Sequence, residues 1–84
     1  MVLGQSQRVI IENENEIPLD LWIEPWGDKQ QIPPGAEFEI VGEASSPGAF
    51  HIAVKEGLVC IYVWRDCTRV TVLQDGAEVA VYTG

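Results

Sequence analysis

The chain has 84 residues, the size of one small domain, and 46% of them are hydrophobic, as is typical of a folded globular protein. Thirteen acidic residues against five basic ones give a formal net charge of −8. Because phosphate groups repel such a surface, this charge argues against nucleic-acid partners and anionic membranes. No stretch approaches the ~20 apolar residues of a membrane span, and residues 1–7 lack the apolar region of a secretory signal, so we expect a cytoplasmic protein.

The negative charge is concentrated in the first half of the sequence. Residues 1–43 contain nine acidic residues against Arg8 and Lys29, whereas residues 44–84 contain four acidic residues against three basic ones. The net charges of the two halves are therefore −7 and −1. A partner that binds the first half is expected to present a basic contact surface.

Short segments of alternating apolar and polar residues, the pattern of half-buried strands, follow one another along the chain. The expected strands span residues 8–13, 19–24, 29–32, 37–41, 50–55, 58–64, 68–73 and 77–82. In the strand 37–41, alternation places Phe38 and Ile40 inward. Pro25 ends the second strand because proline removes a backbone donor. Pro34-Gly35 suits the centre of a type II turn, and Asp75-Gly76 suits a two-residue hairpin.

These elements predict an all-β fold, namely a small antiparallel β-sandwich or partly open barrel of seven to eight strands with no significant helix. The connections between successive strands are too short for parallel crossovers, so the sheets should be mostly antiparallel. We expect a single all-β domain over residues 1–84, with residues 1–7 as a candidate flexible N-terminal tail.

A turn at Arg65-Asp66 would join the strands 58–64 and 68–73 into a central hairpin. One face of this hairpin forms the core, with Val59, Ile61 and Val63 opposite Val72, Val70 and Thr68. The other face brings Tyr62 next to Arg69, a pair suited to a cation–π contact. This second face is too apolar for solvent alone, so another sheet, a terminus or another chain should cover it.

The aromatic residues give the clearest sign of a binding surface, because Trp, Tyr and Arg are concentrated at interface hot spots. The sequence therefore predicts a non-enzymatic protein-interaction or self-association domain with an aromatic patch. The predicted partner-binding residues are Trp22, Trp26, Tyr62, Trp64 and Arg69. The alternative is that Trp22 and Trp26 seal one end of the fold, because a small domain needs large side chains to close it.

Residues suited to catalysis or metal binding are sparse. His51 is the only histidine, and no nucleophile motif accompanies it, so a hydrolase is the weakest hypothesis and no catalytic residue is predicted. Cys60 and Cys67 lack the spacing of a redox motif and are interpreted as free thiols. Together with His51 they suggest the alternative function, a small-ligand or metal-binding module of cupredoxin-like style. A blue-copper site needs a second histidine, so no metal ligand and no cofactor are predicted.

The segment Leu21 to Asp28, LWIEPWGD, is followed by Ile32 to Val41, IPPGAEFEIV. It resembles a pattern in small acidic uncharacterised bacterial all-β proteins, in which a Glu-Pro-Trp-Gly turn precedes a Pro-Gly turn and a strand. A later run in those proteins is similar to Tyr62-Val63-Trp64 of this chain. The resemblance implies an all-β domain of bacterial origin and brings no activity, cofactor or site residue.

Overall fold

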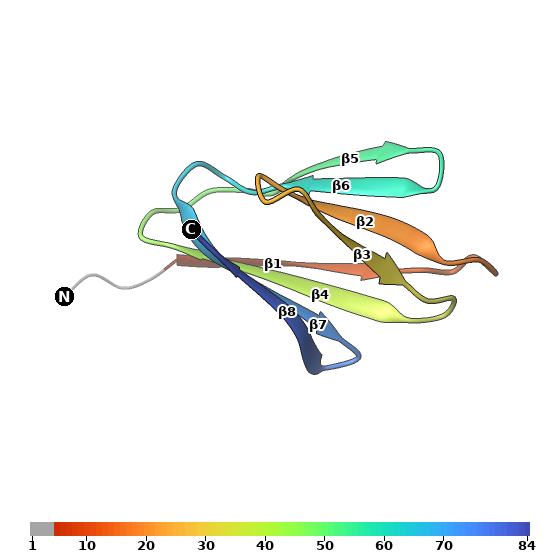
Figure 1. Cartoon of the computed structure of the whole chain (residues 1–84). Coiled ribbons are helices and arrows are strands. Elements are labelled where there is room, and N and C mark those ends of the chain that lie inside the picture. The colour runs from red at the N-terminus through yellow and green to blue at the C-terminus, as the bar shows by residue number, and fades with distance from the viewer. Residues whose placement is uncertain (1–4) are drawn as a thin grey trace.

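The computed structural model describes residues 5–84, which form eight strands in two four-stranded sheets (Figure 1). The strands are β1 (Gln5–Glu12), β2 (Leu19–Glu24), β3 (Asp28–Ile32), β4 (Glu37–Ala44), β5 (His51–Lys55), β6 (Leu58–Tyr62), β7 (Cys67–Gln74) and β8 (Ala77–Thr83). The strand order is β1-β4-β7-β8 in sheet A and β3-β2-β6-β5 in sheet B. The predicted all-β sandwich is confirmed, and residues 5–84 contain no helix that could cross a membrane.

The core lies between the two sheets and is built from the central strands. Alternate residues of β2, β4, β6 and β7 point inward, because successive side chains of a strand point to opposite faces. Their most deeply buried members are Leu21, Ile23, Phe38, Ile40, Ile61, Val70 and Val72. Burying each of these side chains contributes about 1.5–3 kcal/mol to folding.

Two turns predicted from glycine and proline are present. The amide of Ala36 donates to the carbonyl of Pro33 at 3.0 Å, and Gly35 has a φ of 76°, which is the geometry of a type II turn. Asp75 and Gly76 have φ values of 49° and 87°, as a type I′ hairpin between β7 and β8 requires. These turns follow from local sequence because few residues other than glycine, asparagine and aspartate adopt a positive φ.

The predicted hairpin between β6 and β7 is wrong, because β6 belongs to sheet B and β7 to sheet A. The chain does turn at Arg65-Asp66, where the amide of Cys67 donates to the carbonyl of Trp64 at 3.0 Å. However, β6 has already ended at Tyr62, and the next residues carry the chain across the sandwich. Neighbouring strands in sequence often do not pair, and an apolar strand face is buried equally well against an opposite sheet.

Strand β6 pairs instead with β5 and, in parallel orientation, with β2. The other pairings between the described strands are antiparallel. The sequence-based expectation of mostly antiparallel sheets considered only the connections between successive strands. Here β3, β4 and β5 lie between β2 and β6 in sequence and together provide the long connection that a parallel pair needs.

The N-terminal strand begins earlier than the sequence suggested. Residues 5–7, assigned above to a candidate tail, belong to β1 and pair with residues 42–44 of β4. Residues 1–4 lie outside the described part of the chain.

Asn13 ties the β1–β2 connection to the β3–β4 turn. Its side chain is buried, with 1% exposure. Its Nδ2 donates to the carbonyls of Ile17 and Ile32 at 2.8 and 2.9 Å, and its Oδ1 accepts from the amide of Asn15 at 2.9 Å. Its main chain adds hydrogen bonds to residues 35 and 36. One buried amide thus holds two connections at this end of the sandwich together.

Candidate functional site

The parallel pairing of β2 and β6 places a cleft where both strands end. Because the two strands run in the same direction, their C-terminal ends, Glu24 of β2 and Tyr62 of β6, lie at the same end of sheet B. The amide of Val63 donates to the carbonyl of Glu24 at 3.3 Å, one residue beyond the strand. The chain after β2 then turns towards β3, whereas the chain after β6 crosses to sheet A. The two backbones therefore separate and leave an opening between them.

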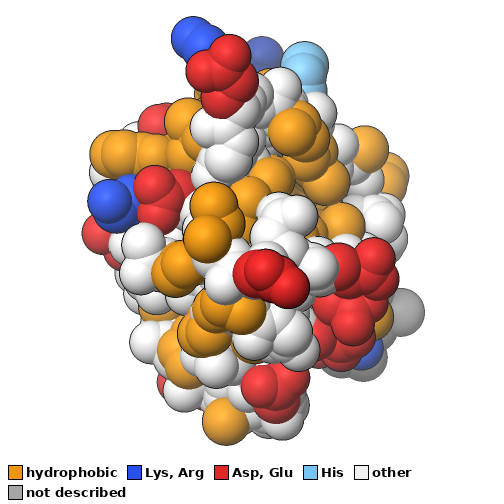
Figure 2. Space-filling model, turned by 90° about the vertical axis from the view of Figure 1, so that its right-hand side faces the viewer, with side chains coloured by type: hydrophobic (Ala, Val, Ile, Leu, Met, Phe, Trp, Pro, Cys, Tyr) orange, Lys and Arg blue, Asp and Glu red, His pale blue; other side chains and the backbone are white. Residues whose placement is uncertain are grey.

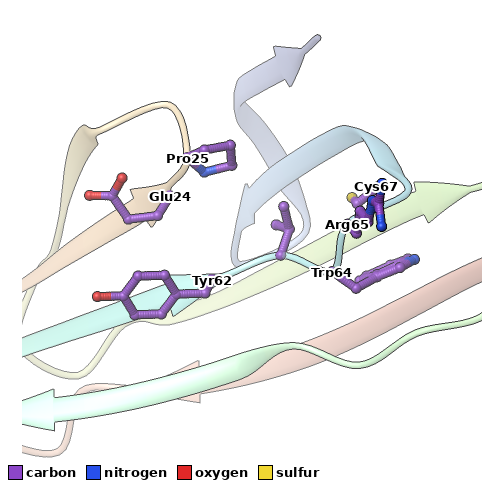
Figure 3. A pocket seen from close by; sticks show the side chains of 7 residues that line it. Glu24, Pro25, Tyr62, Trp64, Arg65 and Cys67 are labelled. Atoms are coloured by element: carbon purple, nitrogen blue, oxygen red, sulfur yellow. The ribbon is translucent and has the colours of Figure 1, made fainter.

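The cleft has a volume of about 340 Å³ and is lined mainly by apolar and aromatic side chains (Figure 3). Its lining residues are Glu24, Pro25, Tyr62, Val63, Trp64, Arg65 and Cys67. In Figure 3, the carboxylate of Glu24 and the ring of Tyr62 project to the same side, and the indole of Trp64 extends away from them. The volume lies at the lower end of the range for ligand pockets, roughly 300–1,000 Å³.

Next to the cleft lies the outward-facing surface of sheet B. We call its apolar part the outer patch; it consists of Trp22, Ala53, Leu58, Cys60 and Tyr62. Trp22 lies beside Cys60 on the neighbouring strand, and Tyr62 lies between Glu24 and His51. The rings of Tyr62 and His51 are 5.6 Å apart in an edge-on arrangement. Sheet A packs against the opposite face of sheet B, so the outer patch faces solvent.

Trp64 borders the cleft but packs mainly against the loop between β4 and β5. A methyl group added at Gly48 would lie 2.1 Å from its ring atoms, and one added at Gly42 would lie 2.8 Å away. The indole Nε1 donates to the carbonyl of Ser46 at 3.2 Å, and the ring meets Phe50 edge-on at 5.4 Å. Trp64 therefore anchors this loop, and glycine is required where the loop touches the indole.

Trp26 lies at another place, where it joins the edges of the two sheets. Its Nε1 donates to the carbonyl of Thr83 at 3.1 Å, and its ring lies 5.6 Å from that of Tyr82. The hydroxyl of Tyr82 donates to the carboxylate of Asp28 and accepts from Nε2 of Gln30 at 2.9 Å. These five residues form the closing cluster, which connects β3 of sheet B to β8 of sheet A.

Tyr82→Phe is expected to lower the free energy of unfolding by about 1 kcal/mol at pH 7, because the hydrogen bonds of the hydroxyl to Asp28 and Gln30 are lost. Burial, followed by the hydrogen bond to Asp28, raises the pKa of Tyr82 above its ordinary value of 10.0. The contribution of Tyr82 is therefore complete below the unfolded pKa and is lost as the pH rises through the folded pKa.

Urea denaturation of the wild type and Tyr82→Phe between pH 7 and 11 measures this effect. The stability difference between the two proteins should shrink at alkaline pH, and Tyr62→Phe, which alters an exposed hydroxyl, should leave the profile unchanged. If the difference in unfolding free energy between wild type and Tyr82→Phe stays constant from pH 7 to 11, the protonated hydroxyl of Tyr82 does not stabilise the fold in the proposed way.

The aromatic residues predicted to form one patch lie at three places. Trp22 and Tyr62 share the outer patch, and Tyr62 and Trp64 both line the cleft. Trp26 belongs to the closing cluster, so the alternative that a tryptophan seals the fold describes Trp26 and not Trp22. The separation arises because Trp26 lies in a turn after β2, where the alternation of the strand no longer fixes its direction.

Arg69 is not part of this surface. It lies on β7 of sheet A, and its Nε is 3.5 Å from a carboxylate oxygen of Glu43. The expected contact with Tyr62 does not form, because the two residues belong to different sheets. Arg65 is instead the cation that lines the cleft. The cleft also includes Val63, which alternation within the predicted strand 58–64 placed on the core face; β6 ends at Tyr62 instead, so Val63 lies beyond the strand and lines the cleft.

The three candidate metal ligands do not form one set. His51 and Cys60 face outward from sheet B, whereas Cys67 is buried on β7 with its Sγ 3.5 Å from the carbonyl of Arg69. No group of three or more histidine, cysteine or acidic side chains among residues 5–84 is arranged to hold a metal ion. Both cysteines are free, and burial raises the pKa of the Cys67 thiol. A thiol with a raised pKa is a poor nucleophile near neutral pH.

The fold and the site define a small β-sandwich with an apolar cleft beside an uncovered sheet face. No family model, no curated protein and no solved structure matches the chain. The function is therefore argued from the geometry of the cleft and the outer patch.

Proposed function

We propose that this protein is a non-enzymatic protein-interaction domain that binds a partner protein through the cleft and the outer patch. The position of Tyr62 carries the proposal, since this residue lines the cleft, belongs to the outer patch and is 44% exposed. A tyrosine combines a large apolar ring with a polar end, and such residues contribute much of the energy of protein interfaces. Trp22 on one side and Val63 on the other extend the apolar surface around it.

Charge favours a partner with a basic contact surface. The chain carries a net charge of −8, which attracts basic proteins over distances of about a Debye length. Asp20 and Glu24 lie on the outward side of β2, and Glu24 also lines the cleft. A lysine or arginine from the partner could pair with Glu24 while apolar side chains of the partner cover Tyr62.

Tyr62→Ser is expected to weaken the partner complex at least about tenfold, because an interface hot spot contributes about 2 kcal/mol or more. Proteins retained by the immobilised wild type from a lysate of the source organism would be identified, and their affinity measured by calorimetry. Val79→Ser is the matched control, since Val79 is 45% exposed on β8 of the other sheet. A partner that binds Tyr62→Ser as tightly as it binds wild type and Val79→Ser would refute the proposal.

A second candidate, small-molecule binding, is supported by the volume of the cleft, about 340 Å³. Nuclear magnetic resonance distinguishes the two candidates. A small molecule should shift the amide signals of Glu24, residues 62–65 and Cys67 alone, whereas a protein partner should also shift those of Trp22, Leu58 and Cys60 on the outward side of sheet B.

We further propose a cytoplasmic location in a bacterial cell. Two free cysteines suit a reducing compartment, and the Glu-Pro-Trp-Gly segment resembles small acidic bacterial proteins.

A further inference from the structure

The two lateral sides of the sandwich differ. On one side the closing cluster joins the edge strands β3 and β8. On the other side the edge strands are β1 and β5, and the inward-facing residues of β5 are uncovered. Figure 2 views the end of the sandwich that carries the β5–β6 turn and shows hydrophobic side chains exposed below that turn. The sandwich is thus closed along one side and open along the other.

Strand β5 exposes residues that belong on a core face. Ile52 and Val54 are aligned with Ile61 and Val59 of β6, both of which are buried. Nevertheless, Ile52 is 41% exposed and Val54 is 76% exposed. Since β5 ends the strand order of sheet B, half of its backbone N–H and C=O groups also have no neighbouring strand. Both the apolar side chains and the backbone of β5 are therefore available for pairing with another strand.

The charge of β5 identifies the kind of strand that fits it. The other edge strands each contain an acidic residue, Glu12 in β1, Asp28 in β3 and Glu78 in β8, whereas β5 contains none. In a chain of net charge −8, pairing of two copies through any of these other edges would add two carboxylates to the interface, whereas self-pairing through β5 adds none within the paired strands.

We propose that two copies of this chain associate by antiparallel pairing of their β5 strands about a two-fold axis at Ala53. In this register Ile52 of each copy lies opposite Val54 of the other, and the two Ala53 residues face each other. Lys55 lies opposite His51, so the two lysines do not meet. All five residues of the strand are paired, whereas a shift by two residues would reduce the overlap. Sheet B then continues from one copy into the next.

The interface is short, so the dimer should be weak. Interfaces of low area form transient complexes, and pairing of one five-residue strand places the dissociation constant on the order of 10–100 µM. The pairing uses the free edge of sheet B, whereas the proposed partner surface centres on Tyr62 and the ends of β2 and β6, and the two surfaces meet only at Ala53. The two associations can therefore be tested separately with variants at Tyr62 and Val54.

Sedimentation equilibrium of the full chain tests the proposal. The mean mass of the wild type should rise from 9.3 kDa towards twice that value between about 1 µM and 1 mM. Val54→Lys should weaken association at least about tenfold, since it places a charge opposite Ile52 of the second copy. Val79→Lys, an equally drastic change on the β8 edge, should leave association unchanged. A wild type that stays monomeric, or equal effects of both variants, would overturn the proposal.

Disulfide trapping tests the register itself. Directly opposed residues of antiparallel strands have Cβ atoms about 4.5–5.5 Å apart, close enough for a disulfide after small adjustments. Ala53→Cys, combined with Cys60→Ser to remove the neighbouring thiol on β6, should form a covalent dimer on mild oxidation at least about tenfold faster than Val79→Cys in the same background. Equal rates for the two variants would show that β5 does not pair in this way.

Discussion

Asn13→Ala is expected to lower the free energy of unfolding by at least about 3 kcal/mol. The substitution removes a side chain that is 1% exposed and satisfies the carbonyls of Ile17 and Ile32 as well as the amide of Asn15. A buried polar group left without a partner costs about 1–3 kcal/mol. The substitution leaves three backbone groups without their partner, and this cost exceeds the gain from no longer burying the polar amide of Asn13. Urea denaturation monitored by circular dichroism measures the change.

Two further variants distinguish the donor from the acceptor role of this amide. Asn13→Asp keeps an oxygen for the amide of Asn15 but cannot donate to the two carbonyls, so its destabilisation should approach that of alanine. Asn15→Ala removes an exposed side chain two residues away and should change stability by less than about 0.5 kcal/mol. A loss below about 1 kcal/mol for Asn13→Ala would mean that water replaces the lost hydrogen bonds.

Gly48→Ala should displace Trp64 and destabilise the fold by about 3 kcal/mol. The added methyl group would lie 2.1 Å from ring atoms of the indole, a distance that real contacts do not reach. The indole would also lose its hydrogen bond to Ser46. Denaturation gives the loss of stability, and a shift of tryptophan emission to longer wavelength reports the displaced indole.

A double-mutant cycle identifies the collision as the cause. In a Trp64→Val background, Gly48→Ala should cost little, because the ring that it meets is absent, so the two effects should be strongly non-additive. Gly42→Ala provides a graded comparison, since its nearest ring atom would be 2.8 Å away and the expected loss is about 1–2 kcal/mol. Additive effects of the Gly48 and Trp64 substitutions would contradict this explanation.

The positions of the strands could be predicted because the signals that define them are local. Alternation placed Phe38 and Ile40 inward, and the pairs Pro34-Gly35 and Asp75-Gly76 identified their turns. Alternation also placed Val59 and Ile61 on the core face, although the predicted partner strand was wrong. Which residues share a face depends on neighbours along one strand, whereas the choice of pairing strand depends on how the whole chain packs.

The same distinction explains the outcome for the candidate site. Trp22 and Tyr62 lie within strands, so their outward direction followed from alternation. Trp26 and Trp64 lie beyond strand ends, and their directions are set by distant residues, Thr83 for the first and Gly48 for the second. The cleft could not be predicted, because it requires the parallel pairing of two strands that are far apart in sequence.

The parallel pairing of β2 and β6 also affects the order in which the protein folds. The β2–β3 and β5–β6 hairpins close over short connections, but Asp20 aligns with Leu58, almost half the chain away. The entropic cost of closing such a long loop makes non-local pairing slow. We therefore expect the two hairpins to form first and to join edge to edge late, so that the cleft exists only in the nearly complete fold. Until the two hairpins join, the unpaired backbone of β2 and β6 and their inward apolar side chains stay exposed, so aggregation is most favoured before this step.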